Sequence, residues 1–217
     1  MNLPLIASLD EILLQVEPCP PRKILFWGEG AGAISSYVAG WMAGKEMDVI
    51  LLDGANRFDP YVVSSFAKKV LIPPESLLKK IRIARAFTCY QMATLIEERL
   101  VSLVGAIHAC TPKCGVSARR HESPLQKPWV IILGPITTFL DEDVSEREVR
   151  SLFERSLRKV EEMTLEGIPF LLFQPSVSPH SKRAYLMRRL FQFSNLIWRI
   201  HLDDEEPKMI LEKDLHV

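Results

Sequence analysis

Four short, continuous runs of apolar residues constrain the fold of this chain more than any other feature. They are the segments KILFWG, DVILLDG, WVIILG and IPFLLFQP, which begin at Lys23, Asp48, Trp129 and Ile168. Strands that are apolar at nearly every position belong to sheets that are covered on both faces, and such sheets are mostly parallel. The segments between the runs have helical patterns. The sequence therefore predicts a single α/β domain over residues 1–217, with a mainly parallel central sheet flanked by helices.

Local signals place the remaining elements of the domain. The predicted helices run from about Gly32 to Gly44, onward from Pro60, from Tyr90 to Val104, from a capping box at Ser145–Glu148 to Gly167, and from about Lys182 to Phe193. The segment IRIARAF, which begins at Ile81, alternates apolar and basic residues and predicts a strand near a sheet edge. The segments NLIWRIHL and KMILEKD, on either side of the acidic turn DDEEP, predict a C-terminal β-hairpin.

Charge balance and cysteine usage bear on the environment of the chain and on its partners. The 217 residues include 27 basic and 27 acidic ones, so net charge gives no general reason to expect nucleic-acid or membrane binding. No apolar run approaches the ~20 residues of a membrane span, and the N-terminal segment lacks the basic region of a signal peptide. Four cysteines without a secretion signal favour a reducing cytoplasm, and no membrane partner is expected.

Residues 105–128 interrupt the alternation of strands and helices. The segment is rich in proline and basic residues, and a connection of this length without regular structure is usually functional or disordered, so a mobile loop is predicted. It contains His108, Cys110, Cys114 and His121, which are zinc-ligand types with a C-x₃-C spacing. These four residues are either metal ligands or incidental loop residues, and the second interpretation is favoured.

The segment FWGEGAGAISSYVAG has the outline of a phosphate loop. It follows an apolar strand and leads into a helix, as the pattern G-x-x-x-x-G-K-[ST] requires. Aligned from Gly28, the pattern places its last glycine on Ala33, its lysine on Ile34 and its hydroxyl on Ser35. The glycine that ends the pattern and the lysine are therefore both absent.

Two interpretations of this segment stay open. The amides at the helix N-terminus can still favour an anion, such as a nucleotide or free phosphate. Alternatively, the glycines only permit a tight strand-to-helix turn, and this interpretation is favoured because the lysine is missing. The candidate nucleotide- or anion-binding residues are Gly28, Glu29, Gly30, Ala31, Gly32, Ala33, Ile34, Ser35, Ser36 and, from a later strand, Gln174.

In their order along the chain, these segments resemble the RecA superfamily, particularly the RadA-type recombinases. LIASLDEIL is similar to the lead-in of that family, and LFWGEGAGAISSYVAGWMA to its first strand, phosphate loop and helix. VILLDGANRFDPYVVSSFAKK and LLKKIRIARAFTCYQMATLIEERL resemble the next two strands with their helices. WVIILGPITTF falls where the Walker B strand of the family lies, and GIPFLLFQPSV where the next strand lies. The match runs from about Leu5 to Glu212 and implies a RecA-like core of the P-loop NTPase type.

The catalytic positions of the family are the places where this chain departs from it. The resemblance places the phosphate-binding lysine on Ile34, the catalytic glutamate on Ala55 and the Walker B aspartate on Gly134. Ser35 keeps the hydroxyl, and Gln174 matches the glutamine that couples the nucleotide state to DNA-binding loops in the family. Because phosphoryl transfer depends on positioning and on electrostatic stabilisation, hydrolysis by the usual mechanism is not expected, and bound ATP with Mg²⁺ is disfavoured.

Acidic residues at two further strand ends are candidates for a metal or for ordinary capping. Asp53 and Asp59 follow the second strand, and capping and turn formation is the favoured role for both. The cluster Asp141–Asp143 follows the WVIILG strand, where it either replaces the lost carboxylate or only leads into a helix N-terminus.

The last predicted helix carries the candidate DNA-binding residues Lys182, Arg183, Arg188 and Arg189. In the family that the chain resembles, a DNA-contacting loop lies at this place. The basic side chains either pair with phosphates or form a solvated face that balances nearby acidic residues.

Three functions are compatible with these observations. The first is a non-hydrolysing accessory or regulatory protein in DNA recombination or repair, which acts by binding a recombinase or another DNA-processing protein, a second copy of itself, or DNA. The second is an ATP-binding protein or DNA-dependent ATPase with a rebuilt site, in which Lys45 or a residue of a partner replaces the missing lysine. The third is a structural subunit of a DNA-processing assembly.

Overall fold

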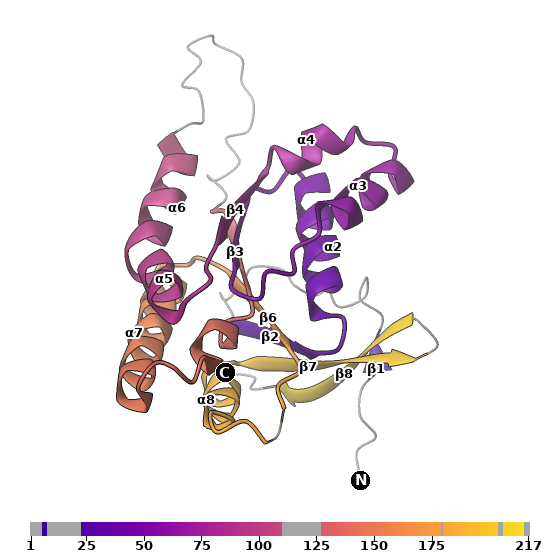
Figure 1. The fold of residues 1–217 in the computed structure, drawn as a ribbon. Helices are drawn as coiled ribbons and strands as arrows, with labels where there is room; N and C mark the ends of the chain where they lie inside the picture. Colours follow the sequence, from indigo (N-terminus) through magenta and orange to yellow (C-terminus); the bar gives the residue numbers. More distant parts are fainter. Residues whose placement is uncertain (1–5, 8–22, 110–126, 179, 204–205, 215–217) are drawn as a thin grey trace.

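The computed structural model describes residues 6–7, 23–109, 127–178, 180–203 and 206–214, which form an α/β fold around one sheet (Figure 1). The sheet has eight strands in the order β1-β8-β7-β2-β6-β5-β3-β4. The strands are β1 (Ile6–Ala7), β2 (Lys23–Gly28), β3 (Val49–Asp53), β4 (Ile81–Arg85), β5 (Trp129–Leu133), β6 (Phe170–Pro175), β7 (Leu196–Asp203) and β8 (Glu206–Asp214).

The sheet is parallel from β7 through β4 and antiparallel at its other end. Strand β2 lies between β6 and β7, with Leu25 opposite Leu172 on one side and Ile197 on the other. Strands β7 and β8 form an antiparallel hairpin, and the short β1 pairs with β8. The predicted mainly parallel sheet, the C-terminal hairpin and the edge position of the IRIARAF strand are thus confirmed. Strand β1 was not predicted, because two residues are too short to show a periodic pattern.

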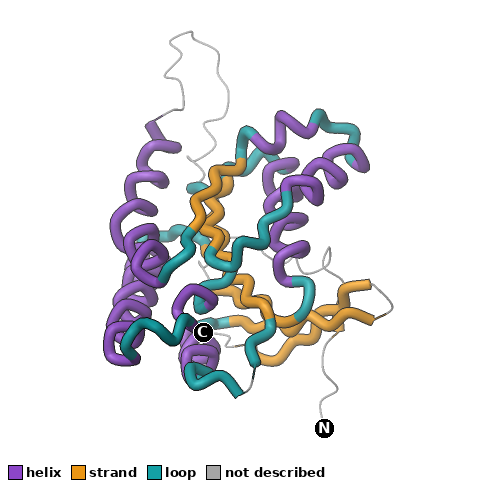
Figure 2. The backbone as a smooth tube through the Cα atoms, viewed as in Figure 1, coloured by secondary structure: helices purple, strands orange, loops and turns teal. Residues whose placement is uncertain are grey.

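Helices cover both faces of the sheet, which explains why its central strands are apolar at nearly every position (Figure 2). One face is covered by α2 (Ala31–Gly44), α3 (Pro60–Lys69) and α4 (Pro74–Leu78). The other face is covered by α5 (Cys89–Thr94), the π-helical turn η1 (Leu95–Arg99), α6 (Leu100–Ala109), the 3₁₀ turn η2 (Thr137–Leu140), α7 (Glu146–Leu165) and α8 (Tyr185–Phe193).

Two predicted helix boundaries are confirmed by their capping contacts. The side chain of Asp59 accepts a hydrogen bond from the amide of Tyr61 at 2.8 Å, so α3 begins at Pro60. The hydroxyl of Ser145 accepts from the amide of Glu148 at 3.3 Å and donates to the carboxylate of the same residue at 2.7 Å. These contacts satisfy amide groups that have no acceptor within their own helix.

Two other predicted boundaries are wrong. The helix expected to end at Val104 continues to Ala109, so residues 105–109 are helical rather than part of a loop. A helical glycine at position 105 costs about 1 kcal/mol relative to alanine, but Val104 and Ile107 are buried and their packing offsets this cost. Residues 110–126 of the predicted loop lie outside the described residues. The last helix begins at Tyr185 rather than Lys182, because residues 181–184 form a turn.

Candidate functional site

The connection between β2 and α2 is a tight turn. Only Glu29 and Gly30 separate the strand, which ends at Gly28, from the helix, which begins at Ala31. Gly30 has a left-handed φ of 79° and is the N-cap of the helix, and its carbonyl accepts from the amide of Ile34 at 3.0 Å. Residues 31–35, which the pattern assigns to a phosphate loop and its lysine, are already helical.

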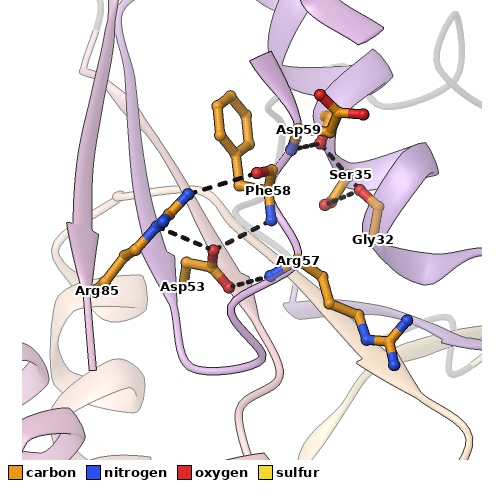
Figure 3. A network of polar contacts seen from close by, with 8 residues as sticks. Gly32, Ser35, Asp53, Arg57, Phe58, Asp59 and Arg85 are labelled. Atoms are coloured by element: carbon orange, nitrogen blue, oxygen red, sulfur yellow. Dashed lines mark hydrogen bonds and ion pairs between the residues drawn. The ribbon is translucent and has the colours of Figure 1, made fainter. Parts of the chain in front are cut away.

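The side chains at the lysine and hydroxyl positions of the pattern, Ile34 and Ser35, are buried in the protein interior. Ile34 is only 6 % exposed and belongs to the core between α2 and the sheet. The hydroxyl of Ser35 donates to the carbonyl of Gly32 at 2.7 Å (Figure 3). The hydroxyl of Ser36 donates to the same carbonyl at 3.0 Å and accepts from the amide of Asp59 at 2.9 Å.

Two glycines of the turn have packing reasons for being glycine. A Cβ atom at Gly28, whose φ is 127°, would lie 2.4 Å from the carbonyl oxygen of Ile200 in β7. A Cβ atom at Gly32 would lie 2.9 Å from the Cβ of Arg57. The close approach of two other chain segments is therefore sufficient to explain both residues.

A buried carboxylate shapes the loop that follows β3. The side chain of Asp53 is inaccessible to solvent, and it accepts from the amides of Arg57 at 3.2 Å and Phe58 at 3.1 Å (Figure 3). Its second interaction is an ion pair with Arg85 of β4, with 3.6 Å between carboxylate oxygen and Nε. Together with the N-cap role of Asp59, these contacts are those of turn-forming residues, as the favoured interpretation of both aspartates expects.

The positions that the resemblance assigns to the catalytic glutamate and the Walker B aspartate lie against each other. Gly134 follows β5 with a left-handed φ of 69°, and a Cβ atom there would lie 2.7 Å from the Cβ of Ala55 and 2.6 Å from the hydroxyl of Thr137. The amide of Gly54 donates to the carbonyl of Leu133 at 2.8 Å, which holds the two loops together. The space that a carboxylate at position 134 needs is therefore filled by the protein.

Gln174 connects the end of β6 to the turn that follows β5. This buried side chain accepts from the amide of Ile136 at 3.1 Å and donates to the carbonyl of Pro175 at 2.9 Å. A longer contact of 3.4 Å reaches the hydroxyl of Thr137. Its amide group is thus satisfied by the protein and contributes to the order of the carboxyl edge of the sheet.

A pocket of about 500 Å³ opens at the N-terminus of α2. It is lined by Gly28, Glu29, Gly30, Ala31, Gly32, Ala33, Arg57, Asp59, Pro175 and Ser176. Six of these residues, Gly28 to Ala33, are anion-binding candidates from the sequence, and Asp59 was a candidate for a metal or for capping. Ile34, Ser35, Ser36 and Gln174 are not part of the lining, because their side chains point into the protein or bond within it.

Arg57 is the charged residue of this pocket that sequence reasoning missed. Its side chain is exposed, extends away from Asp53 (Figure 3), and forms no ion pair with any residue that the structure describes. The available signal was a basic residue in the loop that follows the second strand, in NRFDP. Lys45, by contrast, cannot replace the missing lysine, since it caps the opposite end of α2 with its ammonium 4.0 Å from the ring of Trp41.

The four basic candidates, two in the turn before α8 and two in α8 itself, differ in their surroundings. Arg183 is only 6 % exposed, and its guanidinium donates to the carbonyls of Phe139 at 2.8 Å, Asp141 and Val144. It therefore organises the segment around η2 and does not face a ligand. Lys182 forms an ion pair with Glu142 at 2.8 Å, and its hydrogen bond lowers the pKa of that carboxyl.

Arg189 and Arg188 lie on α8. Arg189 makes two hydrogen bonds to the carboxylate of Glu154, at 2.7 and 2.9 Å, and these raise the pKa of its guanidinium. Arg188 is exposed and has no ion pair with the described residues. Of the four candidates, Arg188 is thus the one whose charge is not already engaged by a neighbouring group in the described structure.

Three of the four metal candidates lie outside the residues that the structure describes. His108 lies in α6, while Cys110, Cys114 and His121 fall outside the described residues. Within the described ranges, no group of three or more histidine, cysteine, aspartate or glutamate side chains is arranged to hold a metal. Cys89 is buried, and burial raises the pKa of its thiol. No helix among the described residues combines the length and the apolar character of a membrane span.

No protein-family model matches the chain, and no curated protein matches it either.

Proposed function

We propose that this protein is a non-hydrolysing, RecA-like accessory protein in DNA recombination or repair that acts through protein partners. The observation that carries the proposal is the contact between Ala55 and Gly134, which fills the place of two catalytic carboxylates. The burial of Ile34 adds to it, because the third catalytic position also faces the core. Since phosphoryl transfer needs a cation, a metal ion and a positioned water at one point, this arrangement supports a role without ATP turnover.

The arrangement of strand ends supports the RecA-like part of the proposal. The turns after β2, β3 and β5 and the side chain of Gln174 in β6 gather at the carboxyl edge of one parallel sheet. This is the edge at which open α/β sheets bind ligands. A protein descended from a RecA-like ATPase would keep the scaffold of the nucleotide site, while its surface binds protein partners.

The test combines turnover with partner binding. We expect no phosphate release from ATP above the buffer rate, with or without single-stranded DNA, and a change in strand exchange when the protein is added to a RadA-type recombinase. DNA-stimulated hydrolysis would contradict the proposal and favour a rebuilt ATPase. An inert protein that neither hydrolyses ATP nor alters strand exchange would favour a structural subunit.

The open edge of β4 is a surface suited to a protein partner. Within the described sheet, β4 is the terminal strand, and Lys80 and Ala86 bond toward β3. By alternation, the N–H and C=O groups of Ile81, Ile83 and Arg85 face outward. Side chains that are exposed beside this edge include Ile83 at 44 % and Phe87 at 67 %. An added strand of a partner recombinase would satisfy these groups.

Variants at this edge test the partner surface. We expect Ile83→Glu with Phe87→Ala to weaken recombinase binding at least about tenfold, since these apolar side chains would be the anchors of the interface. The matched control is Leu71→Ala, which removes an apolar side chain that is 92 % exposed at the end of α3. Equal affinity of the edge variant and the control would exclude β4 as the partner surface.

A second candidate function is the binding of a nucleotide or free phosphate without turnover, and Arg57 is the observation that favours it. The amides of the first turn of α2 have no acceptor within the helix, and the guanidinium of Arg57 borders the same pocket. Glu29 and Asp59 also line the pocket and oppose an anion. Titration with millimolar ATP, ADP and phosphate tests the idea, with Arg57→Gln expected to abolish any response. No response of the unmodified protein would exclude it.

A further inference from the structure

A groove on the outer face of α7 carries an unusual concentration of arginines. It has a volume of about 640 Å³, and its charged lining consists of Arg147, Arg150, Arg155, Arg158, Glu146 and Glu154. Residues 147, 151, 154 and 158 follow one another at helical spacings of four, three and four, so they form one stripe along the helix. The groove lies along α7 from Glu146 to Arg158, on the helix layer that also contains α8.

Both acidic residues of the lining are already engaged by arginines. Glu146 pairs with Arg150 at 3.0 Å, and Glu154 accepts two hydrogen bonds from Arg189 of α8. Arg155 pairs with Glu97 of η1 at 3.1 Å. Within each pair the two charges cancel, so the carboxylates of Glu146 and Glu154 do not neutralise the other arginines of the groove.

Two arginines of the stripe keep uncompensated charges. Arg147 and Arg158 are exposed and form no ion pair with residues in the described part of the chain. They lie eleven positions apart, which corresponds to about 16 Å along the helix, a length over which one strand of a duplex carries about five phosphates. Arg188 of α8, beside the arginine that holds Glu154, adds a third exposed charge on the same helix layer.

The chemistry of the lining fits a phosphate backbone better than a protein. Besides the charged residues, the groove is lined by Ser151, and it contains no apolar or aromatic side chain. Specific protein interfaces usually depend on buried apolar or aromatic anchors, which this surface lacks. Planar guanidinium groups match phosphate oxygens in geometry, and contacts of this kind carry no base specificity.

We propose that the α7 groove binds the sugar-phosphate backbone of a nucleic acid through Arg147 and Arg158, without reading its sequence. The inference rests on the proposed role in DNA metabolism, but it places the nucleic acid on the helix layer rather than at the strand-end loop. Without aromatic side chains for base stacking, the groove is suited to backbone phosphates, which duplex and single strand share.

The test is binding of the full chain to a fluorescent 20-base-pair duplex and to one of its single strands, by anisotropy between 50 and 200 mM salt. For Arg147→Gln with Arg158→Gln, we expect affinity at 100 mM salt to fall about fivefold or more, and the slope of log K against log salt to become shallower by about 1.8 on the duplex. The control, Lys68→Gln with Lys69→Gln on α3, removes the same charge from the opposite face of the sheet. It should change both the affinity and the salt slope less than the α7 variant does. Thermal unfolding establishes that both double variants are folded.

Three results would overturn the inference. They are no binding of either nucleic acid at 50 mM salt, equal losses in the α7 variant and the α3 control, or polyglutamate binding to the groove more tightly than the nucleic acids do. The last result would assign the groove to an acidic protein segment. Because ATP turnover and strand exchange are measured separately, a protein that modulates a recombinase but does not bind nucleic acid would refute this inference alone.

Discussion

Restoring the missing lysine at position 34 is the most direct test of how the β2–α2 segment is built. If the segment were a phosphate loop that had merely lost its lysine, Ile34→Lys would return a cation to the pocket. In the structure, however, Ile34 packs between α2 and the sheet and is 6 % exposed. The substitution therefore places an ammonium group in the core.

The cost of this substitution follows from burial. A fully buried isoleucine side chain contributes about 1.5–3 kcal/mol relative to an exposed one, and most of this is lost. Burying an unpaired charge costs several kcal/mol more, although the flexible lysine stem can recover part of it by reaching toward solvent. We expect a loss of about 3–5 kcal/mol in the free energy of unfolding, a large share of the 5–15 kcal/mol that is typical of a domain.

Guanidinium unfolding monitored by circular dichroism measures this loss, with Ile34→Val as the control. The valine variant should lose only about 0.5–1.5 kcal/mol, because it removes one methylene group without adding charge. A lysine variant with the midpoint of the unmodified protein and a newly acquired affinity for ATP would refute the reasoning. Such a result would mean that residue 34 faces the pocket.

Three further expectations follow from individual contacts. Gly134→Ala should destabilise the protein by about 2–4 kcal/mol in the same unfolding assay, because it adds backbone strain at positive φ and a Cβ atom too close to Ala55; a neutral effect would contradict the contact. Arg183→Ala should cost about 3 kcal/mol, since three carbonyls lose a charged donor, whereas Arg188→Ala should stay within about 0.5 kcal/mol; equal effects would exclude the structural role of Arg183. Lys182→Ala should raise the pKa of the Glu142 carboxyl, which nuclear magnetic resonance titration measures directly. Because that pKa is lowered in the folded protein, the ion pair stabilises the fold above the pKa of the unfolded chain and is lost as pH falls through the folded value; an unchanged titration in the variant would exclude the pair.

Periodicity and local capping signals were sufficient to predict most of the fold. Continuous apolar runs mark strands buried on both faces, and the side chains of Asp59 and Ser145 satisfy helix amides within three residues. The length of the helix that contains Gly105 was underestimated, because its last turns depend on tertiary contacts rather than on local signals. Its continuation depends on the burial of Val104 and Ile107 against the rest of the domain, which no local signal reveals.

The candidate site was only partly predictable. The sequence identified the turn at Gly28–Gly32 and the absence of three residue types at the positions that the resemblance makes catalytic, since these depend on order along the chain. It missed Arg57, because a basic residue in a loop has no pattern of its own. It also grouped Arg183 with Lys182 and Arg188, although Arg183 is buried and the other two are exposed.

The amino-acid sequence by itself determined the class of the fold, the order of its elements and the absence of a catalytic lysine and two catalytic carboxylates at the positions that the resemblance assigns to them. These properties follow from residue type and spacing along one chain. Only the tertiary structure decided that Ile34 faces the core, that Ala55 lies against Gly134, and that Arg57 borders the pocket beside the first turn of α2. Each of these facts depends on segments far apart in the sequence, which meet because β2, β3 and β5 end at one edge of the sheet.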